Sequence, residues 1–349
     1  MILVTGAAGH LGNVLIRELL ARGEQVRGLV LPNENLSSLA GLDIELFEGN
    51  ILDLDRMRAA CEGVSVVQHL AALVTIVPEK LALMRQVNIQ GTANLLLAAR
   101  EAGASRFVYT SSIHAVERPP HGTEINESLH FDPNNPEGPY DQTKAEASIL
   151  VQNANQPGFE TVIVCPTGVI GPYDFNRSEM GEMILGWMKK GPALSMEGQF
   201  DFVDVRDVAK GQILAAEKGK AGEWYLLSGE QISVSRIIEI VQETTGQRSP
   251  EFKFPAWFAR LVAPLAEAWY RVTKTRPRFT RYAIETLQSN SLISSAKARE
   301  ELGWQPMPIA ESIRDTVRWW QENLAQTRSS LRSEAFLRRL RGPKPPDGQ

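Results

Sequence analysis

Residues 2–12 read Ile-Leu-Val-Thr-Gly-Ala-Ala-Gly-His-Leu-Gly, a short apolar strand followed by glycines at positions 6, 9 and 12. A helical pattern begins near Leu11, so the three glycines lie between a strand and a helix. In dinucleotide-binding proteins this junction combines a tight turn, a close approach of backbone to pyrophosphate and a helix N-terminus. The spacing therefore predicts a phosphate cradle, with a plain strand-to-helix turn as the alternative.

The first half of the chain continues this alternation of strands and helices. Short apolar runs rich in β-branched residues alternate with helical stretches, which is typical of a parallel sheet covered by helices. The predicted strands are 2–5, 25–30, 44–48, 65–70, 106–111 and 160–165, and the predicted helices are 11–22, 53–61, 85–102 and 140–154. We expect an α/β fold, a Rossmann-type doubly wound parallel sheet with a smaller, interleaved C-terminal substrate lobe.

The pattern loosens after residue 172. Helices are predicted at 178–190, 204–217, 233–246 and 309–324, with a returning strand at 223–228. We assign residues 1–172 to the dinucleotide-binding domain, to which 200–232 return, and residues 173–199 and 233–325 to the substrate lobe. Residues 326–349 are basic, end in Pro and Gly, and are predicted to be a disordered tail.

The composition is that of an ordinary globular protein. Of 349 residues, 43% are hydrophobic and 22% charged, so the chain can bury a large core. The net charge of −4 gives no electrostatic reason to expect nucleic acid as a partner. Two cysteines exclude a disulfide scaffold and suit a reducing compartment. The early first strand leaves no room for a signal peptide, and no apolar run reaches about 18 residues, so we expect a cytoplasmic protein without a spanning segment.

A second motif, Tyr140-Asp-Gln-Thr-Lys144, predicts a site of proton transfer. The tyrosine and lysine are four residues apart, so they share a helix face, although such a pair also occurs by chance on surface helices. A free tyrosine is a poor acid or base near neutral pH because its pKa is about 10. A nearby ammonium and the positive charge of an oxidised nicotinamide would favour the phenolate and lower this pKa.

Hydroxyl groups at the end of the predicted strand 106–111 strengthen that prediction. This strand runs into Ser111-Ser112, at the edge of the sheet where ligands bind in such folds. A hydroxyl there can donate a hydrogen bond to a substrate oxygen and share its developing charge. Ser112 is our first candidate for this role and Ser111 the second, with ordinary loop serines as the alternative.

The end of the second strand bears on the choice between NAD and NADP. An acidic residue there binds the ribose 2′-hydroxyl, whereas a basic one accepts the 2′-phosphate. The strand ends in Leu31-Pro-Asn-Glu34, with neither type at the expected place. No Lys or Arg occurs from residue 28 to residue 55, so a 2′-phosphate would lack a partner, which favours NAD(H). Arg27 and His10 are the residues that could still allow NADP.

With these motifs the chain resembles the extended short-chain dehydrogenases/reductases of the NAD-dependent epimerase/dehydratase type. The resemblance covers about residues 1–325 and keeps the family's order of landmarks. The matching segments are 6–12, 48–53, 69–72, 87–92, 110–112, 139–144, 166–172, 203–208 and 294–304. The end of the second strand departs from both common patterns of the family.

The resemblance implies roles for individual residues. Tyr140 would be the acid/base, Lys144 would lower its pKa and bind the nicotinamide ribose, and Ser112 would position the substrate. Residues 166–169 would flank the nicotinamide, and residues 50 and 51 would contact the adenine. The full predicted cofactor-binding set is Gly6, Ala8, Gly9, His10, Leu11, Gly12, Leu31, Asn50, Ile51, Leu70, Ala71, Ala72, Thr110, Tyr140, Lys144, Pro166, Thr167, Gly168 and Val169.

The resemblance also bears on the substrate. Nucleotide-sugar epimerases of this family usually carry an arginine for the substrate diphosphate at the place of Phe200, and losing that donor would weaken diphosphate binding. Residues 255–270 carry an apolar helical stripe, read either as a packed helix or as a hydrophobic lid or membrane-facing surface. They resemble the dihydroflavonol-reductase-like and 3β-hydroxysteroid-dehydrogenase-like branches. We therefore expect an NAD(P)-dependent oxidoreductase that interconverts a hydroxyl and a carbonyl on a largely apolar small molecule.

Two other readings remain open. A nucleotide-sugar 4-epimerase or dehydratase would use the same proton and hydride chemistry, and a non-catalytic dinucleotide-binding sensor would keep the fold without turnover. The five histidines are scattered without metal-ligand spacing, so no metal is expected. The resemblance implies a homodimer through helices 85–102 and 140–154, and the apolar segment with the basic tail allows peripheral contact with a membrane.

Overall fold

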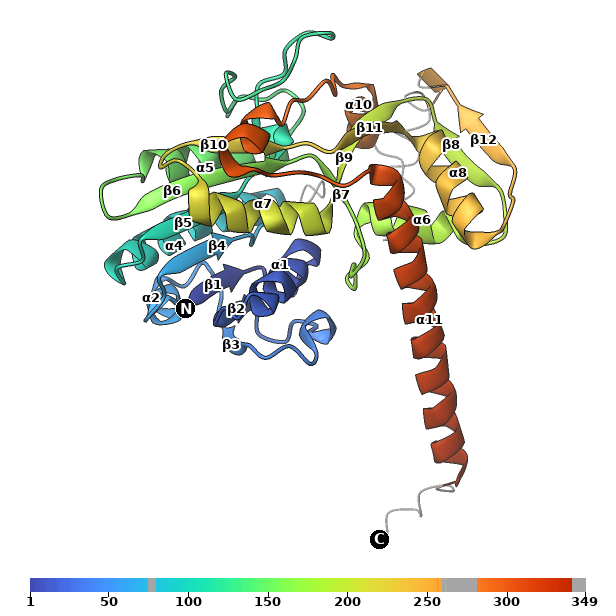
Figure 1. The fold of residues 1–349 in the computed structure, drawn as a ribbon, viewed down its shortest axis with the longest axis horizontal. Coiled ribbons are helices and arrows are strands. Elements are labelled where there is room, and N and C mark those ends of the chain that lie inside the picture. The colour runs from blue at the N-terminus through green and yellow to red at the C-terminus, as the bar shows by residue number, and fades with distance from the viewer. Residues whose placement is uncertain (75–79, 256, 259–260, 262–280, 341–349) are drawn as a thin grey trace.

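The computed structural model describes residues 1–74, 80–255, 257–258, 261 and 281–340 (Figure 1). Its centre is a seven-stranded sheet of order β10-β6-β5-β4-β1-β2-β3, in which every neighbouring pair is parallel. The strands are β1 (Ile2–Thr5), β2 (Val26–Val30), β3 (Glu45–Glu48), β4 (Val66–His69), β5 (Arg106–Thr110), β6 (Glu160–Pro166) and β10 (Trp224–Leu227). The inner strands are almost continuously buried, as strands covered on both faces should be. The predicted parallel sheet is confirmed.

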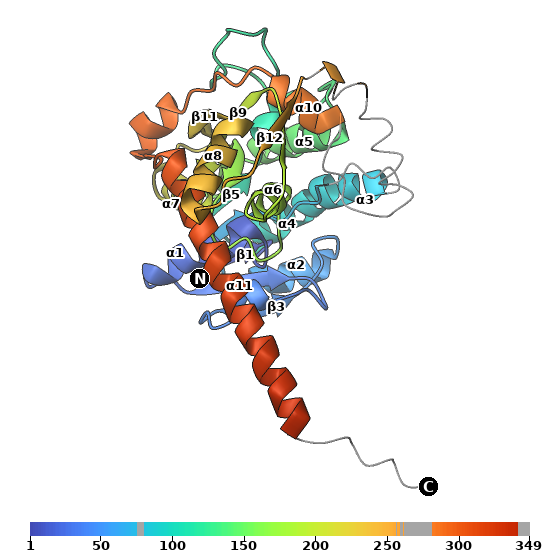
Figure 2. The same ribbon diagram turned by 90° about the vertical axis from the view of Figure 1, so that its right-hand side faces the viewer.

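Helices cover both faces of this sheet (Figures 1 and 2). Helices α1 (His10–Ala21) and α7 (Val205–Lys218) pack against each other on one face. Helices α2 (Leu54–Cys61), α4 (Thr92–Glu101) and α5 (Pro139–Asn153) pack on the other. The helix predicted at 85–102 is interrupted, since α3 (Leu81–Arg85) leads into the π-helical segment η3 (Gln86–Gly91) before α4. Strand order reverses between β4 and β1, which is where ligands bind in open sheets of this kind.

A smaller lobe is built from the second half of the chain. It contains a three-stranded sheet of order β11-β9-β7 and a two-stranded sheet of β12 and β8. These strands are β7 (Gly168–Ile170), β8 (Ala193–Met196), β9 (Gln199–Asp204), β11 (Glu230–Ser233) and β12 (Glu251–Phe254). The helices are α6 (Glu179–Trp187), α8 (Val234–Thr245), α10 (Arg281–Gln288), η5 (Ala298–Leu302) and α11 (Ile309–Leu340). Sequence reasoning missed all five strands, because runs of three to six residues show too little alternation to be recognised.

The predicted disordered tail differs most from the structure. Helix α11 does not end near residue 324 but continues to Leu340, and it projects away from the body of the protein (Figures 1 and 2). The reason lies in the sequence, since no Gly or Pro interrupts residues 309–340 and Gly342-Pro343 follow directly. Residues 341–349 lie outside the described part of the chain.

The apolar segment predicted at 255–270 falls mostly outside the described residues. Of that segment, the structure describes residues 255, 257, 258 and 261, and Trp257 and Leu261 are exposed. In the described part of the chain, none of the helices has both the length and the apolar character needed to cross a bilayer.

Candidate active site

The glycine turn between β1 and α1 has the geometry of a close-packed anion cradle. Gly6 adopts a φ of 67°, and its carbonyl oxygen accepts from the nitrogen of Gly9 at 3.0 Å. A Cβ on Gly12 would overlap the carbonyl oxygen of Gly6, so the turn and the helix can approach only without a side chain there. The N-cap of α1, Gly9, provides no side-chain cap, and the first turn holds no acidic residue. The helix N-terminus is therefore suited to a phosphate group.

Residues from the first domain and from the second lobe close around this turn. The oxygen of Ala8 accepts from Ser38 Oγ at 2.9 Å and from Asn176 Nδ2 at 2.9 Å. His10 Nε2 lies 2.9 Å from the oxygen of Pro172, so this ring ties α1 to the segment after β7. Leu11 packs beside Val169 in the same apolar cluster. The predicted cradle residues 6–12 are thus brought together with the predicted nicotinamide-flanking strand.

The end of β2 places an acidic group where the sequence showed none. Asn33 adopts a left-handed φ of 63°, which folds the chain back so that Glu34 Oε2 accepts from the nitrogen of Leu31 at 2.8 Å. Arg27 lies at the other end of β2, where it binds Glu45 at 2.8 Å and the oxygens of Ala60 and Glu62. His10, the other residue considered for a 2′-phosphate, bonds the oxygen of Pro172.

Side-chain hydrogen bonds hold the backbone of the loop that is predicted to contact the adenine. Asn50 Oδ1 accepts from the nitrogen of Leu52 at 3.0 Å, and Asn94 of α4 donates to the oxygens of Ile51 and Leu52 at 3.1 Å each. Ile51 is buried against Gly91. A Cβ added at Gly91 would lie 2.5 Å from Cδ1 of Ile51. This packing sets the loop at the carboxyl edge of the sheet.

At the end of β4, the backbone is held by a buried hydroxyl. Thr5 Oγ1 accepts from the nitrogens of Leu70 and Ala71 at 3.1 Å each and lies 2.7 Å from His69 Nδ1. Burial lowers the pKa of His69 to about 3, with a smaller contribution from the charge of Lys144, so the ring is neutral. His69 is a packed residue, as the sequence indicated, and Ala72 follows it at the same sheet edge.

The three predicted catalytic residues meet at the carboxyl end of β5. Ser112 caps the short turn η4 (Ile113–Ala115), and its hydroxyl lies close enough to the phenol of Tyr140 to lower the pKa of that phenol. Lys144 is almost fully buried, and its Nζ donates to the oxygen of Thr110 at 2.6 Å and lies 4.4 Å from the ring centre of Tyr109. Burial lowers the pKa of Lys144 to about 7.

The pKa of Tyr140 differs from the sequence-based expectation. Desolvation and the negative charge of Asp141 raise it to about 12, and these effects outweigh the hydrogen bond with Ser112, which lowers it. Among the charged groups that act on the phenol, Asp141 has the largest effect, and it raises the pKa. The second serine candidate is engaged elsewhere, since Ser111 Oγ lies 2.6 Å from Ser148 Oγ on α5.

The predicted nicotinamide-flanking residues form the passage from β6 to β7. Pro166 ends β6, Thr167 is buried, and β7 starts at Gly168. A Cβ on Gly168 would lie 2.5 Å from Cδ1 of Phe202, so β7 and β9 can approach only with glycine there. This passage faces the same edge as Ser112 and Lys144, since Val164 pairs with Thr110 across β5 and β6.

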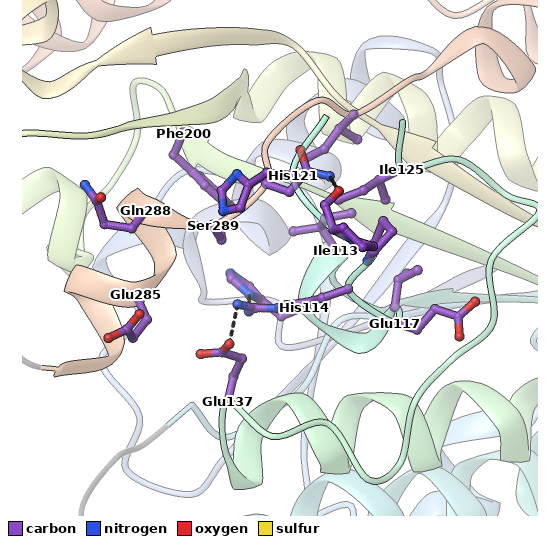
Figure 3. Close-up of a pocket in the computed structure, with 16 residues that line it drawn as sticks. Ile113, His114, Glu117, His121, Ile125, Glu137, Phe200, Glu285, Gln288 and Ser289 are labelled. Atoms are coloured by element: carbon purple, nitrogen blue, oxygen red, sulfur yellow. Dashed lines mark hydrogen bonds and ion pairs between the residues drawn. The ribbon is translucent and has the colours of Figure 1, made fainter. Parts of the chain in front are cut away.

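Ile113, the residue that follows Ser112, lines a pocket of about 410 Å³ (Figure 3). Ser112 and Tyr140 are not among its lining residues. The pocket volume is within the range of about 300–1,000 Å³ that is usual for ligand sites. One wall is apolar, formed by Ile113, Val116, Pro119, Ile125, Phe200 and Ile293. The rings of His114 and Phe200 stack there at 5.8 Å with an angle of 6°. The sequence had singled out Phe200 as the position of the family's diphosphate-binding arginine, and the structure places it in this wall.

The charges that line the pocket are mostly negative. Among the described lining residues, Arg118 is the only Lys or Arg, and it pairs with Glu137 at 3.1 Å, while Glu117 and Glu285 add further carboxylates. A diphosphate here would face like charges. The part of the chain described by the structure also holds no group of three or more metal-binding side chains.

Two groups of residues were missed as site components by the sequence reasoning. Asn88, in the π-helical segment, donates to Thr143 Oγ1 at 3.1 Å and bonds both backbone groups of Leu73, so it ties η3 to the helix of Tyr140. Arg118, Glu137 and Asp141 form an ion-pair cluster beside Tyr140, in which only Asp141 is fully buried. Asn88 lies in a segment that the resemblance had matched, whereas Arg118 stands in a loop without a motif.

Comparison with known proteins gives a family and close relatives. Residues 2–228 match a family model described as the NAD dependent epimerase/dehydratase family. Sterol demethylase protein B of Methylococcus capsulatus is 36% identical over 324 residues, covering 92% of this chain and 98% of that protein. A protein of Synechocystis sp., provisionally named a dihydroflavonol 4-reductase, is 31% identical and covers 92% and 94%. A 3 beta-hydroxysteroid dehydrogenase/isomerase of Mycobacterium tuberculosis is 29% identical and covers 95% and 94%.

Solved structures agree with these matches. The crystal structure of a protein named gox2253 superimposes with a TM-score of 0.79 at 32% identity, covering 93% of this chain and 98% of that one. Relatives at this identity and coverage place the chain in one family from β1 to α11. The resemblance and the branch predicted from the sequence are confirmed.

Proposed function

Because the chain belongs to the NAD dependent epimerase/dehydratase family and is an NAD(P)-dependent oxidoreductase, we propose that its site interconverts a hydroxyl and a carbonyl on an uncharged, largely apolar small molecule. The observation that carries this proposal is that the turn capped by Ser112 packs against the helix of Tyr140, and that Ile113 of this turn lines a pocket with several apolar side chains. Relatives named for sterol and hydroxysteroid substrates support the same substrate class.

In the proposed mechanism, the protein's residues hold and protonate the substrate oxygen. When bound, the nicotinamide coenzyme supplies hydride to the carbonyl carbon or accepts it from the alcohol. Ser112 and Tyr140 both donate hydrogen bonds to the carbonyl oxygen, and the Tyr140 phenol transfers its proton as negative charge develops there. A phenol pKa of about 12 suits a proton donor in the reduction direction. Lys144 would bind the nicotinamide ribose, as the family resemblance implies, and its pKa of about 7 leaves part of it in the ammonium form near neutral pH.

The residues present fit a dinucleotide along the carboxyl edge of the sheet. We propose that residues 6–12 hold the pyrophosphate through α1, that Asn50 and Ile51 lie at the adenine, and that residues 70–72 and Thr110 line the middle of the site. Pro166, Thr167, Gly168 and Val169 would form the wall beside the nicotinamide. The geometry that supports this is the close glycine turn, which leaves backbone rather than side chains at the helix N-terminus.

A substrate panel tests the proposed substrate class. With NADH as hydride donor, we expect purified protein to reduce a 3-ketosteroid and a cyclohexanone derivative, and to leave UDP-glucose unchanged. Conversion of UDP-glucose to its 4-epimer without net NADH consumption would instead support the nucleotide-sugar alternative. Tight NADH binding without turnover of any panel member would support the non-catalytic sensor.

The pocket wall predicts a specific effect of removing the Phe200 ring. Phe200→Leu keeps the side chain apolar but removes the face that stacks with His114, and aromatic pairs are worth about 0.5–1.5 kcal/mol beyond buried area. We expect the KM for a ring ketone to rise by roughly 3- to 10-fold with little change in the KM for NADH. Phe252→Leu, at an exposed position on β12, is the matched control. Equal KM changes in the two variants would contradict the assignment of this pocket.

We propose that the enzyme prefers NAD(H) to NADP(H). The carboxylate of Glu34 lies at the end of β2, where it can accept from a ribose 2′-hydroxyl and would repel a 2′-phosphate. In titrations that follow coenzyme fluorescence, Glu34→Gln should reduce the ratio of NADPH to NADH dissociation constants by about tenfold, or 1.4 kcal/mol. Asp43→Asn, an exposed acidic residue nearby, should leave the ratio unchanged. Tighter wild-type binding of NADPH than of NADH would reverse this proposal.

The partner predictions stay predictions. A homodimer through residues 85–102 and 140–154 would use α4 and α5, which already pack side by side on one face of the sheet. Peripheral membrane contact would use the exposed Phe252, Trp257 and Leu261 in the second lobe. The location of the protein in the cell likewise stays a prediction.

A further inference from the structure

Arg118 reaches both segments that carry the proposed proton-transfer residues. It lies in the loop between β5 and α5, and its guanidinium makes three contacts. One nitrogen donates to His114 Nδ1 at 3.0 Å and to Asp141 Oδ2 at 3.1 Å, and the other lies 3.1 Å from Glu137 Oε1. These partners come from the turn after Ser112 and from the start of the helix of Tyr140. Figure 3 shows His114 and Glu137 on the same side of the pocket.

On the serine side, the guanidinium fixes the turn that Ser112 caps. The backbone nitrogen of His114 donates to Ser112 Oγ at 3.2 Å. Burial lowers the pKa of His114 to about 3, and the charge of Arg118 contributes to this in the same direction, so the ring is neutral. Because Nδ1 accepts from Arg118, the proton of the neutral ring belongs on Nε2. The ring is held between the guanidinium and the face of Phe200.

On the tyrosine side, the guanidinium compensates a fully buried carboxylate. Asp141 follows Tyr140 in the first turn of α5 and is inaccessible to solvent. A buried carboxylate without a cation is strongly unfavourable, so Arg118 stabilises this turn. The same negative charge acts directly on the neighbouring phenol, whose pKa it raises.

We propose that Arg118 is a positioning residue for proton transfer, which ties the turn after Ser112 to the first turn of α5 and compensates Asp141. This tie holds the turn that carries Ser112 against the helix turn that carries Tyr140, and with them the two proposed hydrogen-bond donors. Arg118 itself touches neither coenzyme nor substrate in this role. The inference rests on the proposed function, in which these two hydroxyls hold the substrate oxygen.

The charges around the phenol determine the expected pH dependence. Asp141 and Lys144 lie on the same helix, Tyr109 lies on β5, and His114, Arg118 and Glu137 belong to the loop between them. Removing only the guanidinium takes away a positive charge that partly balances the charge of Asp141 beside Tyr140. The base required for alcohol oxidation should then ionise at higher pH. Replacing Asp141 as well should return the pKa of this base to its wild-type value, but it should not restore the contact between residue 118 and His114.

The experiment compares Arg118→Met, Arg118→Lys and the double variant Arg118→Met/Asp141→Asn, with Arg22→Met as control for loss of a surface ion pair with Glu217. The first readout is kcat and the pH profile of NAD⁺-dependent oxidation of the alcohol that corresponds to the panel ketone. Arg118→Met should lower kcat by roughly 10- to 100-fold, leave the KM for NAD⁺ within about twofold, and move the acidic limb of the profile up by about one pH unit. The double variant should return the limb to the wild-type position while kcat stays low, and Arg118→Lys should recover part of kcat.

The second readout is amide hydrogen exchange, which does not depend on turnover. Arg118→Met should increase exchange in both residues 112–116 and residues 139–143, whereas Arg22→Met should change neither. Wild-type kcat in Arg118→Met overturns the inference, and so does a lower kcat with an unchanged acidic limb, which would indicate general structural damage. If the wild type turns over no panel member, the proposed function fails. Unchanged amide exchange of residues 112–116 and 139–143 in Arg118→Met then separately rejects the proposal that Arg118 holds these two segments together.

Discussion

Replacement of Tyr140 by phenylalanine lowers kcat for ketone reduction by about 10²- to 10⁴-fold, the usual contribution of a positioned general acid. The substitution removes one hydroxyl, on which Ser112 acts, and keeps the ring. Folding should therefore be nearly unaffected, and NADH should bind with close to wild-type affinity. Steady-state rates with the panel ketone and a coenzyme titration measure the two quantities separately.

Tyr225→Phe is the matched control for this substitution. The Tyr225 hydroxyl donates to Glu301 at 2.8 Å and accepts from the nitrogen of Lys220, away from the proposed site. Its loss should cost about 1 kcal/mol of unfolding free energy and leave kcat unchanged. Near wild-type turnover in Tyr140→Phe would remove the phenol from the mechanism and with it the assigned catalytic set.

Substitution of Gly12 by alanine is expected to abolish coenzyme binding. A Cβ at this position would overlap the carbonyl oxygen of Gly6, which is backbone and cannot rotate away. Helix α1 must then shift from the turn, at a cost of about 1–3 kcal/mol for an overpacked site. The same shift moves the helix N-terminus away from the proposed pyrophosphate position. We expect a lower unfolding midpoint and an NADH dissociation constant raised by at least about tenfold.

Gly186→Ala provides the comparison within the same protein. Gly186 lies in α6, where an added Cβ would have no other atom within 4 Å, and alanine is the better helix former. This variant should retain wild-type coenzyme affinity and equal or greater stability. An unchanged dissociation constant in Gly12→Ala would show that the glycine turn does not hold the coenzyme.

The sequence was sufficient for the central sheet because its inner strands are buried apolar runs, each followed by a glycine or polar turn. The assignment of Ser112, Tyr140 and Lys144 as catalytic residues stays a prediction. The sequence could not foresee the direction of the Tyr140 pKa, because desolvation and Asp141 act through a packing that a linear motif does not contain.

Two other features of the site also depend on the tertiary fold and could not be predicted from the sequence. Glu34 stands three positions beyond Leu31 in the sequence, and only the left-handed conformation of Asn33 returns its carboxylate to the strand end. Arg118 lies 22 positions before Tyr140 in a segment without regular periodicity, so its contact with Asp141 follows from the tertiary fold alone. The length of α11 was missed for a different reason. Residues 326–340 favour a helix, but their basic composition led to the prediction of a disordered tail.

The passage from β6 to β7 has a mechanical consequence. One residue, Thr167, separates a strand of the central sheet from a strand of the second lobe, and β9 leads from that lobe directly into α7. Because both links are short, a large rotation of the second lobe relative to the central sheet would break strand pairing rather than bend a flexible linker. We therefore expect a stiff frame in which reactants enter and leave through small rearrangements at the rim, so that stiffness, rather than closure, keeps the reacting atoms aligned.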